Sequence, residues 1–336
     1  MTRTTLMLTV LTMAVCGCRK EQQQARTVRI DGSSTVFPIM EAIAEEFQKS
    51  QPSYSVIVGV SGTGGGFKKF AASETDISGA SRPIRPVETE ACAAGGVEYV
   101  ELPLSYDGLA VVVNPANDWA NHISVEELKR LWQPEAQNKI MRWSQIREGW
   151  PDKEVHLYGP GVDSGTYDYF TAAIVGTEHS SRGDFTSSED DNVLVQGIAG
   201  DPLALGFFGL AYFEENRSKL KLLPVDDGNE SNGAGPVLPT FQTVRDGTYQ
   251  PLSRPVFMYV STSSLSRPEV EAFVRYALAH SAHLVEEVGY ISLPERAYSL
   301  AQSRVDKRIT GSLFGGKGSQ IGVKIEDLLE REEQDK

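Results

Sequence analysis

The fold is decided at residues 28–47, which read VRIDGSSTVFPIMEAIAEEF. The start of this stretch predicts a short strand, and a turn rich in serine and threonine follows it. Ile39, Ile43 and Phe47 then recur at a spacing of four residues, which places them on one face of a helix. The stretch therefore predicts a strand, a polar turn and an amphipathic helix in direct succession.

The same order of elements returns along the chain. Helices are predicted from residue 67, behind the capping box that Ser124 and Glu127 form, around residues 170–174 and behind Ser266. The acidic tail from residue 326 is expected to be solvated. Alternation of strands and helices predicts a mostly parallel sheet covered by helices. Further strands are predicted at residues 54–60, 76–81, 109–113, 154–158 and 256–260.

The bulk composition is that of an ordinary globular protein. The chain has 336 residues, of which 40% are hydrophobic and 23% charged. Because a single core rarely grows beyond about 250–300 residues, this length predicts two domains. The net charge of -13 disfavours nucleic acid and anionic membrane surfaces as partners, since both attract basic patches. It does not disfavour a small anion, because a buried site depends on its own local donors.

The first residues have the features of an export signal. The apolar run at residues 6–15 has the length of a signal-peptide core and is too short to span a bilayer. Cys18 follows Gly17, as in a bacterial lipobox, and this resemblance implies a signal peptide of residues 1–17 and a lipid on Cys18. Plain cleavage with a free cysteine is the alternative. Residues 18–26 then form a polar tether, and Cys92 has no intramolecular disulfide partner.

Three clusters of small polar residues lie between a predicted strand and the next helix. They are residues 32–35 (GSST), 61–66 (SGTGGG) and 163–166 (DSGT). Ligands of open α/β sheets bind at this edge, and the N-terminus of a helix attracts anions. Capping of a helix accounts for one such cluster, but three clusters hold more hydroxyls and glycines than capping requires. The clusters therefore predict a site for a small oxyanion.

Other kinds of site fit the sequence less well. The glycines of residues 62–66 match neither the dinucleotide fingerprint nor the P-loop. No His or Cys cluster has the spacing of metal ligands, so we expect neither a metal nor a cofactor. Ser164, Asp163 and a histidine such as His156 invite a hydrolase interpretation, but the Gly-x-Ser-x-Gly signature is absent. We expect a binding protein and not an enzyme, with a serine-dependent hydrolase as the weaker alternative.

Five stretches resemble the PstS-type phosphate-binding proteins, which are the capture subunits of the phosphate ABC importer. They are residues 31–38 (DGSSTVFP), 60–67 (VSGTGGGF), 76–83 (DISGASRP), 163–166 (DSGT) and 310–315 (TGSLFG). The resemblance implies an α/β fold, the two-lobed periplasmic-binding-protein fold of type II, with the ligand in the interdomain cleft. It also implies that phosphate is contacted by Ser34, Thr35, Val36, Ser61 or Thr63, Ser81, Arg82, Ser164, Gly165 and Thr166.

One departure from the family pattern concerns the charged residues. The familiar branch has an aspartate after Gly-Ala-Ser and an arginine four residues before Ser-Gly-Thr, where this chain has Arg82 and Pro160. We therefore expect Arg82 to be the cation that clamps the anion. Asp163 is the expected acid: its carboxylate accepts the proton that phosphate carries and sulfate lacks, and it can pair with Arg82. Capping of the helix at residue 165 is an equal alternative for Asp163.

The resemblance also implies how the chain is divided and used. We expect one lobe from residues 27–107 with 256–325, a second lobe from residues 108–255, and an acidic tail at residues 326–336. An anion that bridges both lobes favours their closed state. The expected function is high-affinity binding of inorganic phosphate and its delivery to the membrane subunits of an ABC importer; a receptor for sulfate or molybdate is the alternative. We expect a periplasmic monomer that is held to a bacterial membrane by its lipid alone.

Overall fold

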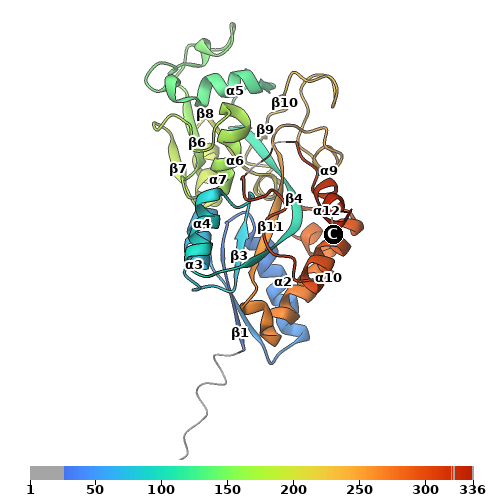
Figure 1. The fold of residues 1–336 in the computed structure, drawn as a ribbon. Helices are drawn as coiled ribbons and strands as arrows, with labels where there is room; N and C mark the ends of the chain where they lie inside the picture. Colours follow the sequence, from blue (N-terminus) through green and yellow to red (C-terminus); the bar gives the residue numbers. More distant parts are fainter. Residues whose placement is uncertain (1–25, 319, 321, 335–336) are drawn as a thin grey trace, which may run out of the picture.

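A mixed sheet of ten strands runs through the molecule (Figure 1). The computed structural model describes residues 26–318, 320 and 322–334. The short strands β9 (Lys221–Leu222) and β12 (Ile291–Ser292) pair with β4, and β5 (Ile123–Ser124) pairs separately with β10 (Val225–Asp226). The main path of the sheet is, in order, β2 (Ser55–Val58), β1 (Thr27–Gly32), β3 (Ile77–Ala80), β11 (Ser253–Ser261), β4 (Tyr99–Val113), β8 (Ala204–Gly209), β6 (His156–Pro160) and β7 (Thr186–Ser188).

Parallel strands lie at both ends of this sheet. β1 pairs in parallel with β2 and β3, and β6 pairs in parallel with β7 and β8. β4 and β11 lie between these two groups and run antiparallel to their neighbours. The predicted alternation of strands and helices, and with it the α/β class, is confirmed.

The two central strands, β4 and β11, connect the two halves of the sheet, and we call them the connecting strands. β4 pairs with β11 over residues 99–108 and with β8 over residues 109–113. Both strands are buried along their whole length. They are longer than predicted because their polar residues are buried with partners. One example is Glu101, which accepts a hydrogen bond of 2.6 Å from the hydroxyl of Tyr259.

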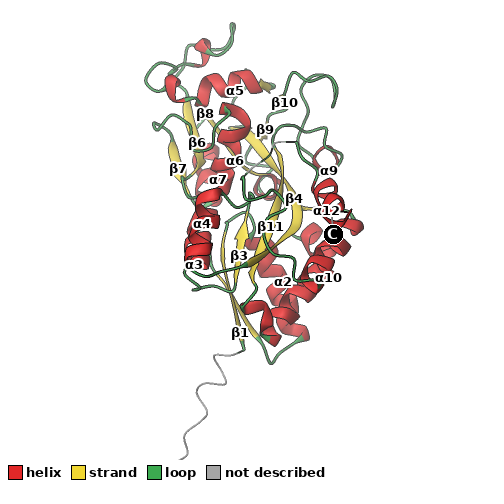
Figure 2. Cartoon of the chain, viewed as in Figure 1, coloured by secondary structure: helices red, strands yellow, loops and turns green. Residues whose placement is uncertain are grey.

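Helices accompany both halves of the sheet (Figure 2). The half with β1–β3 holds α2 (Phe37–Ser50), α3 (Gly62–Ala71), α4 (Pro86–Ala94), α10 (Pro268–Glu287), α11 (Glu295–Asp306) and α12 (Ile325–Gln334). The half with β6–β8 holds α5 (Val125–Trp132), α6 (Gly165–Phe170), α7 (Asp191–Gly200) and α8 (Leu210–Glu215), whereas α9 (Phe241–Arg245) packs on β4 and β12. A π-helical turn at Thr171–Val175 continues α6, and short 3-10 turns occur at Pro134–Ala136, Trp143–Gln145 and Ser264–Ser266.

The buried apolar residues form two clusters. In the first, α2 packs on α10, and the ring centroids of Phe47 and Phe273 are 5.4 Å apart. In the second, the rings of Phe170 and Phe207 stack with centroids 3.6 Å apart, and Trp132 packs edge-on against both. Since Phe170 ends α6 and Phe207 belongs to β8, this aromatic packing fixes α6 against the sheet.

The glycine run of residues 62–66 differs from the prediction. It forms the first turns of α3 rather than a loop before that helix. A Cβ added at Gly66 would lie 2.5 Å from the Cα of Gly32. The absence of side chains therefore lets α3 pack directly on the end of β1, which brings the start of α3 close to the turn before α2.

The acidic C-terminal segment is not the solvated tail that the sequence predicted. Residues 325–334 form α12, whose Ile325 and Leu329 are buried. Glu333 pairs with Arg296 of α11 at 2.6 Å. The helix is amphipathic: its acidic residues lie on one side, and its apolar side packs against the rest of the protein.

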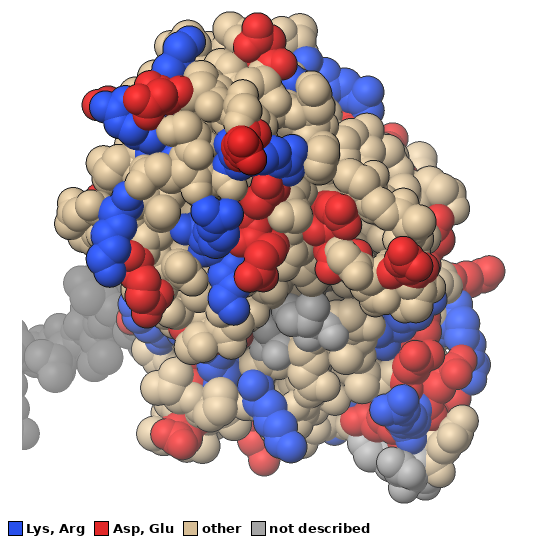
Figure 3. All heavy atoms as spheres, turned by 90° about the horizontal axis from the view of Figure 1, so that it is seen from above, with Lys and Arg blue, Asp and Glu red and all other residues tan. Residues whose placement is uncertain are grey.

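The surface and the N-terminal segment add two observations. Within the described residues, no helix is both long and apolar enough to cross a membrane. The predicted signal peptide and Cys18 lie outside the described residues. On the face seen from above, acidic and basic side chains are interspersed (Figure 3). The described residues of this face therefore form no broad basic surface that would attract anions from solution.

Candidate functional site

Four hydroxyl side chains meet between the two halves of the sheet, and we call them the hydroxyl cluster. Thr35 lies in the turn before α2 and Thr166 in the first turn of α6, and their Oγ1 atoms are 3.1 Å apart. Thr63 of α3 and Ser81 after β3 form a second pair, whose hydroxyl oxygens are also 3.1 Å apart. All four residues are buried. The three predicted loops are thus brought to one place.

Gly165 is where the two halves come closest at this cluster. A Cβ added at Gly165 would lie 2.6 Å from both Ser81 Oγ and Thr63 Oγ1, so no side chain fits there. The backbone makes a further contact, because the N–H of Gly64 donates to the carbonyl of Asp163 at 3.1 Å. The structure therefore shows the two halves closed on each other at the candidate site.

A buried arginine that the sequence analysis did not identify lies at the hydroxyl cluster. Arg254 of β11 is 1% exposed. Its Nη2 donates to Thr166 Oγ1 at 2.7 Å and is 3.4 Å from Thr35 Oγ1. Its Nη1 donates to the carbonyl of Gly165 at 3.0 Å. Arg254 therefore contacts both halves of the site and is the cation of the hydroxyl cluster.

Asp107 of β4 is the acid beside Arg254. Its Oδ2 accepts hydrogen bonds from Arg254 Nε and Nη2 at 3.1 and 2.8 Å. Its Oδ1 is buried and accepts no well-aligned hydrogen bond among the described residues, although the backbone N–H of Leu210 lowers the pKa of this carboxyl. Burial raises the pKa of Asp107 above its usual value, although Arg254 opposes the rise. A buried acceptor oxygen is therefore available beside the hydroxyl cluster.

The sequence contains a pattern that could have identified Asp107 and Arg254 as a buried pair. Asp107 stands just before the apolar run of residues 109–113, and Arg254 stands just before the run of residues 256–260. A charged residue within a buried strand has to be paired. The sequence alone does not tell which charges pair across strands that are almost 150 residues apart, and the pair was missed for that reason.

Arg82 has a different place from the anion clamp that the sequence predicted. Its side chain is fully buried, and Nη1 and Nη2 donate to the two oxygens of Glu88 at 2.8 and 2.7 Å. Its Nε donates to Asp168 Oδ2 at 2.5 Å, and Nη1 also reaches the carbonyl of Pro83 at 3.1 Å. The expectation is corrected because two carboxylates already occupy the guanidinium. The predicted pairing of Arg82 with Asp163 does not form.

Asp163 also differs from both of its predicted roles. Its side chain is 48% exposed and pairs with Lys68 at 3.1 Å. The cap of α6 is Ser164, whose Oγ accepts a hydrogen bond of 3.1 Å from the N–H of Thr166. The acid is exposed because it precedes the capping residue, and the buried acceptor near the cluster is Asp107 instead.

Three further predicted residues surround the cluster, and each of them makes a hydrogen bond outside it. The hydroxyl of Ser61 donates to Asp31 Oδ1. The N–H of Val36 donates to the carbonyl of Ser33 at 3.1 Å. The carbonyl of Ser34 accepts from the hydroxyl of Tyr212 at 3.3 Å. Of the alternatives Ser61 and Thr63, only Thr63 belongs to the hydroxyl cluster.

Acidic residues of the half that holds β6–β8 lie close to the hydroxyl cluster. Burial raises the pKa of Asp191 in α7 to about 7, against the lowering effect of Arg254, and Asp107 adds to the rise. Burial also raises the pKa of Glu189. A cavity of about 320 Å³ is lined by Ser34, Glu189 and Tyr212, so it opens at the edge of the cluster. Negative charge at this opening does not attract an anion, so binding has to rely on the buried donors.

The histidine of the hydrolase interpretation does not lie against Ser164. His156 is directed elsewhere, since its Nδ1 lies 2.6 Å from Asp201 Oδ2. The hydroxyl of Ser164 serves as the cap of α6. Within the part of the chain that the structure describes, no group of three or more His, Cys, Asp or Glu residues is arranged to hold a metal ion.

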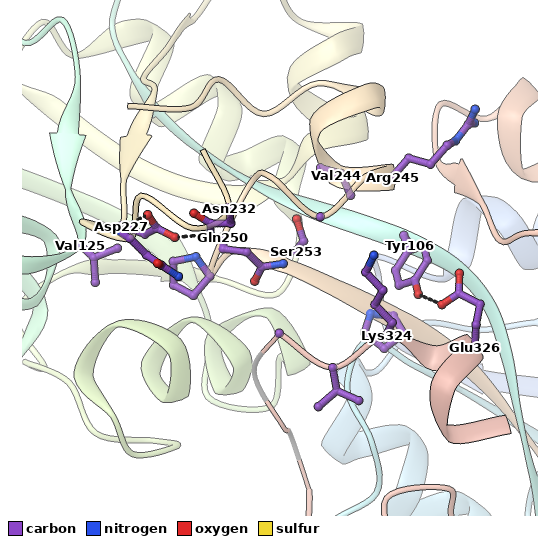
Figure 4. A pocket seen from close by; sticks show the side chains of 16 residues that line it. Tyr106, Val125, Asp227, Asn232, Val244, Arg245, Gln250, Ser253, Lys324 and Glu326 are labelled. Atoms are coloured by element: carbon purple, nitrogen blue, oxygen red, sulfur yellow. Dashed lines mark hydrogen bonds between the residues drawn. The ribbon is translucent and has the colours of Figure 1, made fainter. Parts of the chain in front are cut away.

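A cavity of about 520 Å³ lies on the other face of the connecting strands (Figure 4). Tyr106, Ser253 and Pro255 contribute to its wall. These residues alternate along the strands with Asp107 and Arg254, so they point away from the hydroxyl cluster. This cavity contains none of the clustered hydroxyls, so the hydroxyl cluster remains the candidate for the oxyanion site that the sequence predicts.

Comparisons with known proteins agree on one family. Residues 19–281 match the model of the PBP superfamily domain. The protein SphX of Synechococcus elongatus is 49% identical over 309 residues, which are 92% of this chain and 90% of that protein. The phosphate-binding protein PstS of Staphylococcus saprophyticus is 35% identical over 282 residues, which are 83% of this chain and 84% of that protein.

Solved structures give the same result. A possible phosphate-binding protein from Planctomyces limnophilus is 47% identical, with a TM-score of 0.62 over 84% of this chain and 98% of that chain. A putative phosphate ABC transporter substrate-binding protein from Clostridium perfringens, crystallised with phosphate, gives a TM-score of 0.67 over 80% of this chain and 100% of that chain. At 23% identity, the second likeness concerns the fold alone. The predicted two-lobed fold is confirmed.

Proposed function

The chain belongs to the PBP superfamily and, within it, to the PstS-type phosphate-binding proteins, and from this premise we propose that it captures inorganic phosphate for an ABC importer. The observation that carries the proposal is the hydroxyl cluster with Arg254 at its centre. Neutral hydroxyls and one cation suit a small tetrahedral anion, whose oxygens accept hydrogen bonds from several directions.

The strength of binding follows from the number of donors. A hydrogen bond to a charged group contributes about 1.5–3 kcal/mol, and micromolar affinity requires about 8 kcal/mol. The four hydroxyls, the guanidinium of Arg254 and nearby backbone N–H groups supply enough donors to exceed this value. The excess is needed because the anion has to be dehydrated and the two lobes have to close.

Selectivity for phosphate is proposed to come from Asp107. Phosphate near pH 7 carries a proton and can donate a hydrogen bond to the unpartnered Oδ1 of Asp107. Sulfate has no such proton, so the same carboxylate would repel it. This role replaces the one that the sequence predicted for the exposed Asp163.

Calorimetry of the mature domain against phosphate, sulfate, arsenate and molybdate tests the function. We expect phosphate to bind with micromolar or higher affinity, arsenate to bind similarly because it also carries a proton, and sulfate to bind far more weakly. Preference for sulfate or molybdate would replace phosphate as the ligand. The absence of binding for all four anions would refute the oxyanion site.

Two lobes and a closing movement are part of the proposal. The lobe boundaries predicted at residues 107/108 and 255/256 lie within the connecting strands, next to Asp107 and Arg254. An anion held by both lobes stabilises the closed state in proportion to its higher affinity for that state. The protein acts as a monomeric carrier, and it performs no catalysis in this role.

Attachment to the membrane is also proposed. We infer that the signal peptide directs export and that a lipid on Cys18 holds the protein to a bacterial membrane on its periplasmic side. Labelling of cells with radioactive palmitate tests this attachment. The wild-type protein should carry the label and the Cys18→Ser variant should not, whereas an unlabelled wild-type protein would contradict the anchor.

A further inference from the structure

A buried ionic cluster joins the two halves of the protein beside the hydroxyl cluster. Arg82 donates to Asp168 at 2.5 Å and to both oxygens of Glu88 at 2.8 and 2.7 Å. Arg85 adds a second cation, 3.2 Å from Glu88 and 3.7 Å from Asp168. The side chains of Arg82 and Asp168 are 0% and 1% exposed. The cluster is therefore desolvated in the closed structure.

The members of this cluster come from opposite sides of the site. Arg82 directly follows Ser81 and lies with Glu88 in the half that holds β1–β3. Asp168 belongs to α6, two residues after Thr166, in the half that holds β6–β8. Each half thus contributes one anion-site hydroxyl and, next to it, one partner of the ion pair.

Arg82 pairs with Glu88 inside one half of the protein, whereas its pair with Asp168 joins the two halves and requires them to be closed. Glu88 holds Arg82 in place from within the same half, and burial alone would raise the pKa of Glu88, but hydrogen bonds from Arg82 keep it below its usual value. Asp168 reaches Arg82 only while α6 lies against the loop after β3. Separation of the halves breaks the contact with Asp168 and leaves the contact with Glu88 intact.

We propose that Arg82, oriented by Glu88, is an inter-lobe latch that closes on Asp168 and slows the release of phosphate without touching it. The inference rests on the proposed function, because it assigns a residue to the closing step of the same site. A latch raises the fraction of molecules that are closed, and the apparent affinity rises with that fraction. It acts on every bound anion alike, since it contacts none of them.

Release of phosphate provides the first test. The protein is loaded with radioactive phosphate and then chased with excess unlabelled phosphate, and association is measured separately. Asp168→Asn should release phosphate about tenfold faster or more, with little change in association, because loss of one partner of a buried pair acts mainly on dissociation. The ratio of phosphate to sulfate affinity should stay that of the wild type.

Two further variants sharpen this test. Arg82→Lys keeps the charge but cannot bridge both carboxylates, so it should speed release in the same way if Asp168→Asn does not fold. Lys68→Met is the matched control, because Lys68 also pairs across the halves, with Asp163, but is 73% exposed. Its release rate should stay within about twofold of the wild type, since exposed pairs contribute little.

The possible outcomes separate the latch from other roles. A lower melting temperature with unchanged release would overturn the latch and leave a structural role. Tighter binding by Asp168→Asn would overturn it too and show that Asp168 acts as a charge that repels the anion. A change in the ratio of phosphate to sulfate affinity in Arg82→Lys alone would show direct contact with the anion.

Scattering separates failure of the latch from failure of the proposed function. If the wild type binds no phosphate, the proposed function is wrong, yet ligand-free Asp168→Asn should still be less compact than the ligand-free wild type. Equal compactness of the two ligand-free proteins, together with equal release rates, would refute the latch while phosphate binding by the wild type stands.

Discussion

Arg254 Nη2 lies 2.8 Å from Asp107 Oδ2, and both side chains are buried where the connecting strands pass the hydroxyl cluster. The pair is neutral as a unit, so an anion that enters adds a charge that the pair does not fully balance. Hydrogen bonds from hydroxyl and backbone N–H groups have to stabilise the negative charge that the pair leaves unbalanced. The same pair joins β4 to β11, which places the cation of the site on the strands that link its two halves.

Replacement of Arg254 tests its role as the cation of the site. Arg254→Lys should weaken phosphate binding about 100-fold, because a lysine keeps the charge but cannot point at Asp107, Gly165 and Thr166 at once. Calorimetry measures the affinity, and circular dichroism checks that the variant folds.

A matched control for Arg254→Lys is Arg147→Lys. Arg147 makes a two-pronged contact with Glu127, at 2.7 and 2.6 Å, in the half that holds β6–β8. Its replacement should leave phosphate affinity unchanged. Wild-type affinity in the folded Arg254→Lys variant would remove Arg254 from the site.

Asp107→Asn should reduce the preference for phosphate over sulfate at least about tenfold. An asparagine at this position has to turn its oxygen toward Arg254, so its NH₂ group replaces the free acceptor Oδ1. Phosphate then loses an acceptor for its proton, and sulfate gains a donor. Competition between the two anions measures the ratio directly.

The exposed Asp163 provides the control for that experiment. Asp163→Asn should keep the wild-type ratio of phosphate to sulfate affinity, because its carboxylate pairs with Lys68 at the surface. The reverse result, a ratio lost in Asp163→Asn and kept in Asp107→Asn, would return the selecting role to the residue that the sequence suggested.

The sequence predicted the donor loops well because their pattern is local. Thr35, Thr63 and Thr166 each stand in a short motif between a strand and a helix, and the edge of a parallel sheet brings such motifs together. The charges could not be assigned in this way. Arg82 was assigned to the anion site because it follows Ser81 in the sequence. Its actual partners, Glu88 and Asp168, depend on how α4 and α6 pack. Arg254 gained its role from a strand pairing that no local pattern encodes.

Asp191→Asn should stabilise the protein at neutral pH and not in acid. Burial raises the pKa of Asp191 from 3.8 to about 7. The folded state thus binds the proton more tightly than the unfolded state, so stability is fully present below about pH 4 and falls as the pH rises toward 7. Asparagine removes this loss, which amounts to a few kcal/mol at most.

Denaturant unfolding at several pH values measures the effect of Asp191→Asn. The gain over the wild type should be close to zero at pH 3.5, grow between pH 4 and 7, and stay constant above pH 7. Asp190→Asn changes the neighbouring acid, which is more exposed and caps α7. Its effect should be small at every pH, because asparagine also accepts the hydrogen bond from the N–H of Asn192 and caps a helix about as well as aspartate. A gain in Asp191→Asn that does not vary with pH would contradict the raised pKa.

Gly165→Ala should prevent the lobes from closing and leave each lobe intact. The new Cβ would lie 2.6 Å from Ser81 Oγ and Thr63 Oγ1, and both of these atoms belong to the opposite half. The clash disappears when the halves separate, so the ligand-free melting temperature should change little. Phosphate affinity should fall about 100-fold, because only the open state remains accessible. The matched control is Gly200→Ala at the end of α7, where an added Cβ meets no atom within 4 Å. Scattering decides the outcome: compaction of Gly165→Ala by phosphate, equal to that of the wild type and the control, would show that closure does not require the glycine.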